Sequence, residues 1–179
     1  SGLGVLEASL VAEQIGSYAV PSPWIGNSIM APTAILFEKD NHLAEKWLPL
    51  IASGEITACI SLSEVIGKRG DLGLNVSGDK VSGINIFGID GELDPAIIIT
   101  AVNNNLILIE TDNNGVEINE IPTIDSTRPV VEIIFDSSNY VIIPGEKEAI
   151  QKTIDVGRIG LAGDLLLSLI HISEPTRPR

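Results

Sequence analysis

Two short groups of charged residues have types and spacing that suit anion binding or charge pairing. Lys68 and Arg69 lie in a glycine-flanked loop, where cations and free backbone N–H groups suit a pyrophosphate. A solvated basic turn explains the same two residues without a ligand. Asp155 and Arg158 are three residues apart, so on a helix they can pair with each other.

The other potentially reactive residues have no neighbours in the sequence with which they would form a catalytic or metal site. Arg128 lies in a turn and could be tied to an acidic neighbour such as Asp125. Cys59 is the only cysteine, which excludes an intramolecular disulfide, and without a nearby histidine it is expected to be a small packed residue. His42 has no ligand partners in its predicted helix, and no His/Cys/carboxylate cluster predicts a metal site. Neither a Walker A motif nor GxGxxG is present.

The bulk composition excludes several classes of partner. The formal net charge of −13 argues against a nucleic-acid partner, and any anionic ligand must meet cations that are concentrated locally. The sequence contains no signal peptide and no apolar run near 18 residues, so we expect neither secretion nor a membrane span. A cytoplasmic location is the simplest assumption for a chain with one cysteine.

The first third of the chain has helical periodicity. Residues 3–16 carry apolar side chains at 3.6-residue spacing, with Gly16 as a candidate C-cap. A second helix is expected from Gly26 to Phe37, restarting at Pro32. A third, capped by Asp40 or Asn41 and closed at residues 53–54, carries Leu43, Trp47 and Leu48.

Residues 56–143 have the pattern of strands. In residues 56–63 apolar and small polar side chains alternate, which predicts a strand with one apolar face. Residues 76–81 form a hairpin pattern, and apolar runs follow at 97–102, 106–109, 116–121, 130–135 and 141–143. Because no helix-length segment separates these runs, we expect about seven mostly antiparallel strands in a small barrel or sandwich.

These patterns predict an α+β chain in four parts. Residues 1–54 are expected to be the end of an N-terminal helical domain, 55–143 a middle β-domain, and 144–167 the start of a C-terminal helical domain. Residues 168–179 are polar, broken by prolines and similar to a translated sequencing adaptor, so we expect a non-native tail. The start at Ser1-Gly2, without Met, indicates a chain that begins inside a longer protein.

Five segments together resemble the acyl-CoA dehydrogenase family. "WLPLIASGEITACISLSE" (residues 47–64) is similar to the family's "YLP-LASGE-AA-ALTEP", and "DKVSGINIFGID" (79–90) to "G-LSG-K-WIT-A". "LDPAIIITA" (93–101) resembles "AD-LLVAA", and "DVGRIGLAG" (155–163) resembles "D-GR-GIAA". "PTIDSTRPVVEIIFDSS" (122–138) is similar to the "LDxTR" version of divergent, often hetero-oligomeric members. The resemblance covers residues 1–167.

The resemblance implies an FAD enzyme of fatty-acid and lipid metabolism that oxidises the Cα–Cβ bond of an acyl-CoA substrate. In that family a Glu of the C-terminal helical domain removes the α-proton, and flavin N5 accepts the β-hydride. We expect this base to lie outside the 179 residues, so the chain alone is expected to be inactive. An electron-transfer partner and a homo- or hetero-oligomer are also implied.

The family's motifs assign roles to residues of this chain. Residues of two strands are expected to line FAD: Ile60, Leu62, Ser63, Phe87, Gly88 and Ile89. Here Ser63 replaces the family's Thr, whereas Ile89 lacks the hydroxyl found at that position, and a core Phe87 is an equally good explanation. Arg69, Asp155 and Arg158 are expected to contact the substrate.

Departures from the family pattern leave two alternatives open. Where "EPGAGSD" is usual this chain has "EVIGKRGD" (residues 64–71), and Asn85 stands where Lys is common. These changes favour a non-catalytic partner subunit of a heteromeric dehydrogenase. A flavin oxidase or hydroxylase of the same fold is the third possibility.

Overall fold

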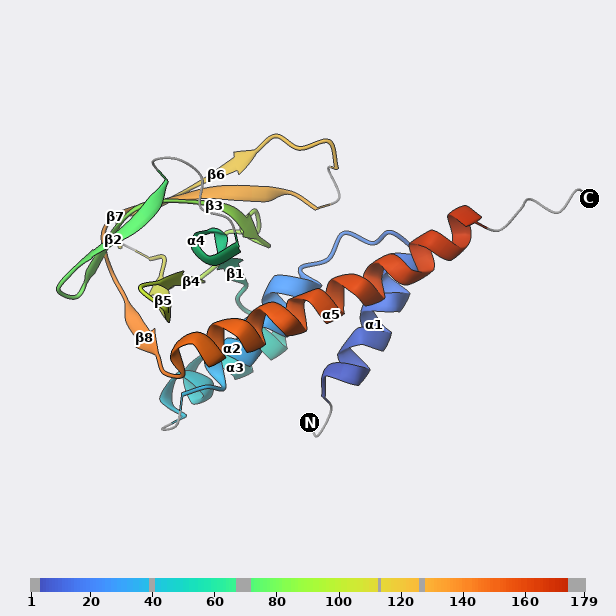
Figure 1. Cartoon of the computed structure of the whole chain (residues 1–179), viewed down its shortest axis with the longest axis horizontal. Helices are drawn as coiled ribbons and strands as arrows, with labels where there is room; N and C mark the ends of the chain where they lie inside the picture. The colour runs from blue at the N-terminus through green and yellow to red at the C-terminus, as the bar shows by residue number, and fades with distance from the viewer. Residues whose placement is uncertain (1–3, 39–40, 67–71, 113, 126–127, 174–179) are drawn as a thin grey trace, which may run out of the picture.

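The computed structural model describes residues 4–38, 41–66, 72–112, 114–125 and 128–173 (Figure 1). The helices are α1 (Val5–Ser17), the π-helix η1 (Trp24–Met30), α2 (Ala31–Ile35), α3 (His42–Ser53), α4 (Ser63–Ile66) and α5 (Glu146–Ser173). The strands are β1 (Ala58–Ser61), β2 (Gly73–Ser77), β3 (Lys80–Ile89), β4 (Ile97–Val102), β5 (Asn105–Glu110), β6 (Val116–Ile121), β7 (Val130–Asn139) and β8 (Val141–Ile143). The predicted α+β class is confirmed.

The strands form one eight-stranded sheet in the order β6-β7-β3-β1-β4-β5-β8, with β2 added on β3. All described pairings are antiparallel except β1 with β4. The mostly antiparallel arrangement is therefore confirmed, but the sheet is not closed into a barrel. The first half of α5 lies below the sheet beside α2 and α3, and its second half extends away from the sheet and packs against α1 (Figure 1).

Strand β1 is buried on both faces, which contradicts the predicted half-polar strand. Ala58 and Ile60 pack in the cluster that the sheet shares with the helices. Cys59 packs in a second cluster on the opposite face, and Ser61 is buried as well. The reason is position: β1 lies between β3 and β4, and both of its faces are covered. The expectation that Cys59 is a packed residue is confirmed.

Helix α1 packs through its small residues. Gly16 was predicted as a C-cap, but the helix continues to Ser17, and a Cβ on Gly16 would lie 1.9 Å from the backbone oxygen of Asp164 in α5. The large side chains Leu6 and Leu10 are exposed, whereas Ala12 is buried. The close approach of α1 to α5 therefore depends on glycine.

The C-terminal helix carries glycines at three-residue spacing, on the face that meets its neighbours. A Cβ on Gly157 would lie 2.6 Å from Sδ of Met30, and one on Gly160 would lie 2.8 Å from Cδ1 of Ile29. A Cβ on Gly163 would lie 2.7 Å from the carbonyl oxygen of Ser9 in α1. This row explains the glycines of "DVGRIGLAG" as helix-packing positions.

Helices and sheet share one core that runs across the predicted boundaries at 54 and 144. Helix α3 ends at Ser53 with left-handed Gly54, as predicted. Asn41 precedes it without a side-chain cap; Glu38 accepts the N–H of Leu43 instead.

Helix α5 continues to Ser173, past residue 167, and the origin of residues 168–179 stays a prediction. Within the described ranges, none of the helices combines the length and the apolar character that a membrane span needs.

Candidate functional site

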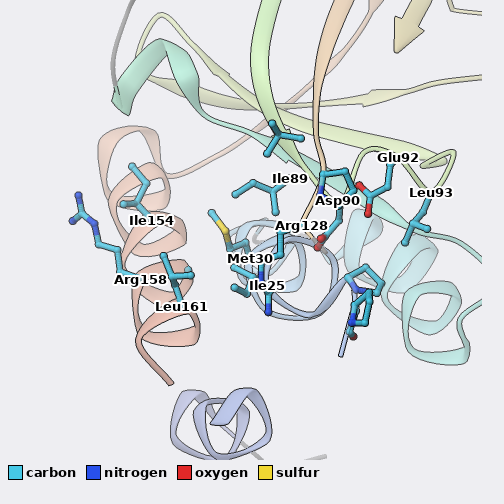
Figure 2. A pocket seen from close by; sticks show the side chains of 16 residues that line it. Ile25, Met30, Ile89, Asp90, Glu92, Leu93, Arg128, Ile154, Arg158 and Leu161 are labelled. Atoms are coloured by element: carbon cyan, nitrogen blue, oxygen red, sulfur yellow. The ribbon is translucent and has the colours of Figure 1, made fainter. Parts of the chain in front are cut away.

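A pocket of about 580 Å³ lies where η1, α5 and the loops after β3 and before β7 meet (Figure 2). This is within the usual range of about 300–1,000 Å³ for small-molecule sites. Its walls are mostly apolar, and the polar side chains among them are few. The apolar part comprises Ile25, Met30, Ile89, Leu93, Val130, Ile154 and Leu161; the charged part comprises Asp90, Glu92, Arg128 and Arg158.

The pocket has two chemically different ends. Asp90, Glu92 and Leu93 follow β3 and lie on one side, which we call the loop end (Figure 2). Ile154, Arg158 and Leu161 come from α5 and lie on the other side, the helix end (Figure 2). A ligand that fills the pocket would therefore contact a buried carboxyl group at the loop end, whereas the guanidinium of Arg158 points outward from α5 at the helix end (Figure 2).

Asp90 joins the loop end to the π-helix. Its Oδ2 accepts the backbone N–H of Asn27 at 2.9 Å, and a Cβ on Gly26 would lie 2.7 Å from the same oxygen. The Oδ1 atom of Asn27 in turn accepts the N–H of Ala58 at 2.9 Å. This chain of contacts fixes η1 against the start of β1 and the end of β3.

The carboxyl group of Asp90 is poorly hydrated, since the residue is only 7% exposed. Burial raises the pKa of Asp90 to about 6. The hydrogen bond from the backbone N–H of Asn27 lowers this pKa, and the negative charge of Glu92 raises it further. The carboxyl group is thus held in an apolar wall with a reduced preference for its charged form. A π-helix often marks a functional position, and here it supplies Ile25 and Met30 to the pocket.

Arg128 fastens the loop before β7 to α5. Its Nη2 lies 2.6 Å from Oδ1 of Asp164, a residue buried on α5. The sequence suggested Asp125 as a partner, and the ion pair that forms reaches 36 residues along the chain instead. Arg128 also lines the pocket beside Asp90.

The six residues expected to line FAD, which we call the predicted flavin surface, lie in unlike environments. Ile60 and Leu62 are buried in the core between sheet and helices. Gly88 is buried too, and a Cβ there would lie 2.7 Å from Cγ2 of Val131. Their side-chain positions therefore have packing explanations, which leaves Ser63, Phe87 and Ile89 as the residues able to present a side chain.

Ser63 is hydrogen-bonded within the chain. Its hydroxyl contacts Oδ1 of Asn85, and it accepts the N–H of Ile86 at 3.3 Å. The Nδ2 of buried Asn85 donates to Oγ1 of Thr100 at 2.6 Å and to the carbonyl of Ser61 at 3.3 Å. The residue that departs from the family's Lys is thus the centre of a polar cluster that holds β1, β3 and β4 together.

Phe87 is 42% exposed, so it is not a core residue. Its φ of +61° is rare for a bulky residue, and it coincides with a register shift between β3 and β7 at Asn85 to Gly88. A bulge of this kind turns a side chain out of the strand. Ile89, two residues on, lines the pocket. Phe87 is therefore an exposed aromatic residue two positions before a pocket-lining residue in the sequence.

The expected substrate contacts are only partly described. Arg69, with Lys68, lies outside the described residues. Asp155 and Arg158 form an ion pair of 3.3 Å along α5, as their spacing predicted. Arg158 lines the pocket, whereas Asp155 is not among its lining residues.

Sequence reasoning missed Asp90, Asn27 and Glu92. Asp90 is the last residue of the family-like segment "DKVSGINIFGID", but the sequence predicted no function for it. That role depends on Asn27, 63 residues away, and only the folded chain brings the two together. Within the described part of the chain no group of His, Cys, Asp or Glu side chains could hold a metal ion.

No protein-family model and no curated protein sequence matches the chain, but solved structures do. A variant of the steroid ACAD (acyl-CoA dehydrogenase) Tcur3481-Tcur3483 has a TM-score of 0.79 at 20% identity, over 98% of this chain and 52% of that chain. A glutaryl-CoA dehydrogenase from Mycobacterium smegmatis in complex with FADH2 has a TM-score of 0.69 at 16% identity, over 93% and 48%. The ChsE4-ChsE5 complex from Mycobacterium tuberculosis has a TM-score of 0.73 at 17% identity, over 99% and 52%.

The chain thus has the fold found in acyl-CoA dehydrogenases, and it spans about half the length of the structures that it matches. The fold expected from the sequence resemblance is confirmed. At these levels of identity the likeness concerns the fold alone.

Proposed function

We propose that this chain is part of an FAD-dependent oxidoreductase that introduces an α,β double bond into acyl-CoA thioesters. The observation that carries the proposal is the match to acyl-CoA dehydrogenase structures over nearly the whole chain, with a TM-score of 0.79 for the steroid ACAD. A pocket of about 580 Å³ at the junction of helices and sheet supports it. An electron-transfer partner would reoxidise the flavin.

The pocket suits the two halves of an acyl-CoA molecule. Its apolar wall, with Ile25, Ile89 and Leu161, would bury the acyl group and gain the free energy of removing that group from water. Arg158 at the helix end is exposed and can meet an anionic group of CoA. Asp155 would position Arg158 through their ion pair rather than touch the substrate.

The residues present fit a flavin through one aromatic contact. Phe87 is exposed and lies two residues before pocket-lining Ile89 in the sequence, and its ring would stack on the flavin, since aromatic rings stack favourably on one another. When bound, the flavin supplies a hydride acceptor. Ser63 would help by shape and not by donating a hydrogen bond, because its hydroxyl already contacts Asn85.

Flavin retention tests the cofactor part of the proposal. The chain is mixed with FAD and desalted, and the flavin absorbance that stays with the protein is measured. We expect wild type to retain flavin and Phe87→Ala to lose about tenfold in affinity, since stacking on an aromatic contributes about 1 kcal/mol or more. Ile142→Ala removes another exposed apolar side chain, 52% exposed, from distant β8 and should leave the flavin affinity unchanged. Equal retention by all three proteins would contradict the role of Phe87.

A non-catalytic partner subunit is the second candidate. It is favoured by the inward hydrogen bonds of Ser63 and by the missing hydroxyl at Ile89. A chain that binds acyl-CoA but retains no FAD would support this candidate over the first. In either case we expect no α,β-unsaturated product from the chain alone with a dye as electron acceptor, and formation of that product would contradict this expectation.

A further inference from the structure

The loop end of the pocket is rich in negative charge. Asp90 is buried in the wall, and Glu92 follows it at the rim. Asp164 lies directly behind Arg128, with which it forms the 2.6 Å ion pair. Two carboxyl groups, those of Asp90 and Glu92, therefore line the place where a ligand would reach the end of β3, and Asp164 pairs with the neighbouring Arg128 from outside the lining.

Positive charge at this end is already paired. Within the described ranges, Arg128 is the only cation among the residues that line the loop end, and Asp164 is close enough to neutralise it. A ligand carboxylate placed here would meet the charge of Asp90 in a poorly hydrated wall, where like charges repel strongly.

The helix end differs in hydration, because its ion pair is largely exposed whereas the pair of Arg128 and Asp164 is largely buried. Arg158 is exposed there, and its partner Asp155 lies 3.3 Å away on the solvent side of the helix. An anionic group can approach Arg158 without losing its water. The pocket therefore has a direction: an anionic part of a ligand that extends past the helix end can reach solvent and exposed Arg158, whereas the part at the loop end meets the buried carboxyl group of Asp90 (Figure 2).

We propose that Asp90 is a specificity-determining residue, which restricts the loop end of the pocket to uncharged groups and so excludes ligands with a second carboxylate. This inference rests on the proposed function for its substrate class, acyl thioesters whose acyl group ends in an uncharged, apolar group. The repulsion itself depends only on the pocket. Glu92 adds to the selection from the rim.

Two matched ligand pairs test this selection on the whole chain. In the first pair, decanoate and decanedioate displace a neutral fluorescent apolar probe from the protein at pH 7.5. In the second pair, the ligands are octanoyl-CoA and suberyl-CoA, which have equal acyl length and differ in the terminal carboxylate. We expect the ligand without the second carboxylate to bind about tenfold or more tightly in each pair, as for an unfavourable like-charge contact.

Charge-removing variants place the effect on Asp90. Asp90→Asn keeps an acceptor for the Asn27 N–H. We expect it to bring the ratio of the two affinities in each ligand pair to within about threefold of unity, and Glu92→Gln to lower that ratio less. Asp94→Asn is the control, since Asp94 lies in the same loop, is exposed and does not line the pocket. Circular dichroism checks that each variant is folded.

The outcomes separate the two proposals. Failure of both CoA thioesters to bind, with the decanoate preference intact, would refute the acyl-CoA function and leave the selection by Asp90 standing. Equal or tighter binding of decanedioate by wild type would overturn the selection and would assign Arg128 as a carboxylate receptor. The inference is also overturned if neither acid displaces the probe, or if Asp94→Asn changes the ratio as much as Asp90→Asn.

Discussion

The pocket and the predicted flavin surface lie next to each other and share Ile89. The sequence alone suggested the flavin surface, whereas it did not suggest the pocket. The six residues of the predicted flavin surface lie on or just after two neighbouring strands, so local motifs were enough to propose them. The pocket joins η1, α5 and two loops, and its central contacts link Asp90 to Asn27 and Arg128 to Asp164. Local motifs thus found strands and helix starts, whereas the pocket is made by contacts between distant segments.

The two regions also differ in what their polar groups do. At the predicted flavin surface, Ser63 and the adjoining Asn85 direct their hydrogen bonds into the protein and stabilise the sheet. In the pocket, Asp90 is buried and also lines the cavity. We therefore expect substitutions in the polar cluster of Asn85 to change mainly stability, and substitutions at the pocket to change mainly binding and pH dependence.

The largest effect is expected where α5 meets α1 behind the pocket. Gly16→Ala should lower the free energy of unfolding by about 4 kcal/mol, because its Cβ would lie 1.9 Å from the Asp164 backbone oxygen and the helices must separate. Urea unfolding measures the change. Gly4→Ala is the control, since its Cβ would have no neighbour closer than 3.6 Å, and a loss below about 1 kcal/mol is expected. Similar losses for both variants would contradict the close approach of α1 and α5.

The next effect is expected in the polar cluster of the flavin surface. Asn85→Ala should lower the free energy of unfolding by about 3 kcal/mol, because Thr100 and the carbonyl of Ser61 lose their partner in a buried place. The measurement is again urea unfolding, with exposed Asn75→Ala on neighbouring β2 as the control. A cost below about 1 kcal/mol would show that the cluster does not stabilise the sheet.

A smaller, pH-dependent effect is expected at Asp90. Because its pKa is raised to about 6 by burial, the folded protein binds this proton more tightly than the unfolded chain. The stability that protonation contributes is complete below about pH 4 and is lost as the pH rises to about 6. Asp90→Asn should therefore be more stable than wild type by about 2 kcal/mol at pH 7.5 and no more stable at pH 4. A difference independent of pH would contradict a raised pKa for Asp90.

The smallest effect on stability is expected at Phe87. Its ring is exposed and its backbone is in the left-handed region, so Phe87→Ala should change the free energy of unfolding by less than about 0.5 kcal/mol. Thermal unfolding without ligand measures it. A loss above about 2 kcal/mol would show that Phe87 supports the fold and would weaken its assignment to a cofactor.

Particular residues show how far the sequence could be interpreted. The strand runs, the Gly78-Asp79 turn and the start of α5 after Gly145 were predicted because local chemistry decides them. Burial of Ser61 was not predicted, since it depends on which strands flank β1. The packing role of Gly16 was missed because its neighbour, Asp164, is far away in the sequence. Asp90 lies in one of the family-like segments, but its partner Asn27 is 63 residues away, in a helix that was expected without its π geometry.

The most direct test of the account asks whether an acyl-CoA occupies the pocket. Leu161 lines it from α5 and is 43% exposed, whereas Leu165 on the same helix is 49% exposed and does not line it. Isothermal titration of octanoyl-CoA into wild type, Leu161→Trp and Leu165→Trp compares a substitution that fills the pocket with one that does not. We predict that Leu161→Trp lowers the affinity for octanoyl-CoA by about tenfold or more, and that Leu165→Trp keeps the wild-type affinity. Equal affinities for the three proteins, or no binding by wild type, would contradict the account.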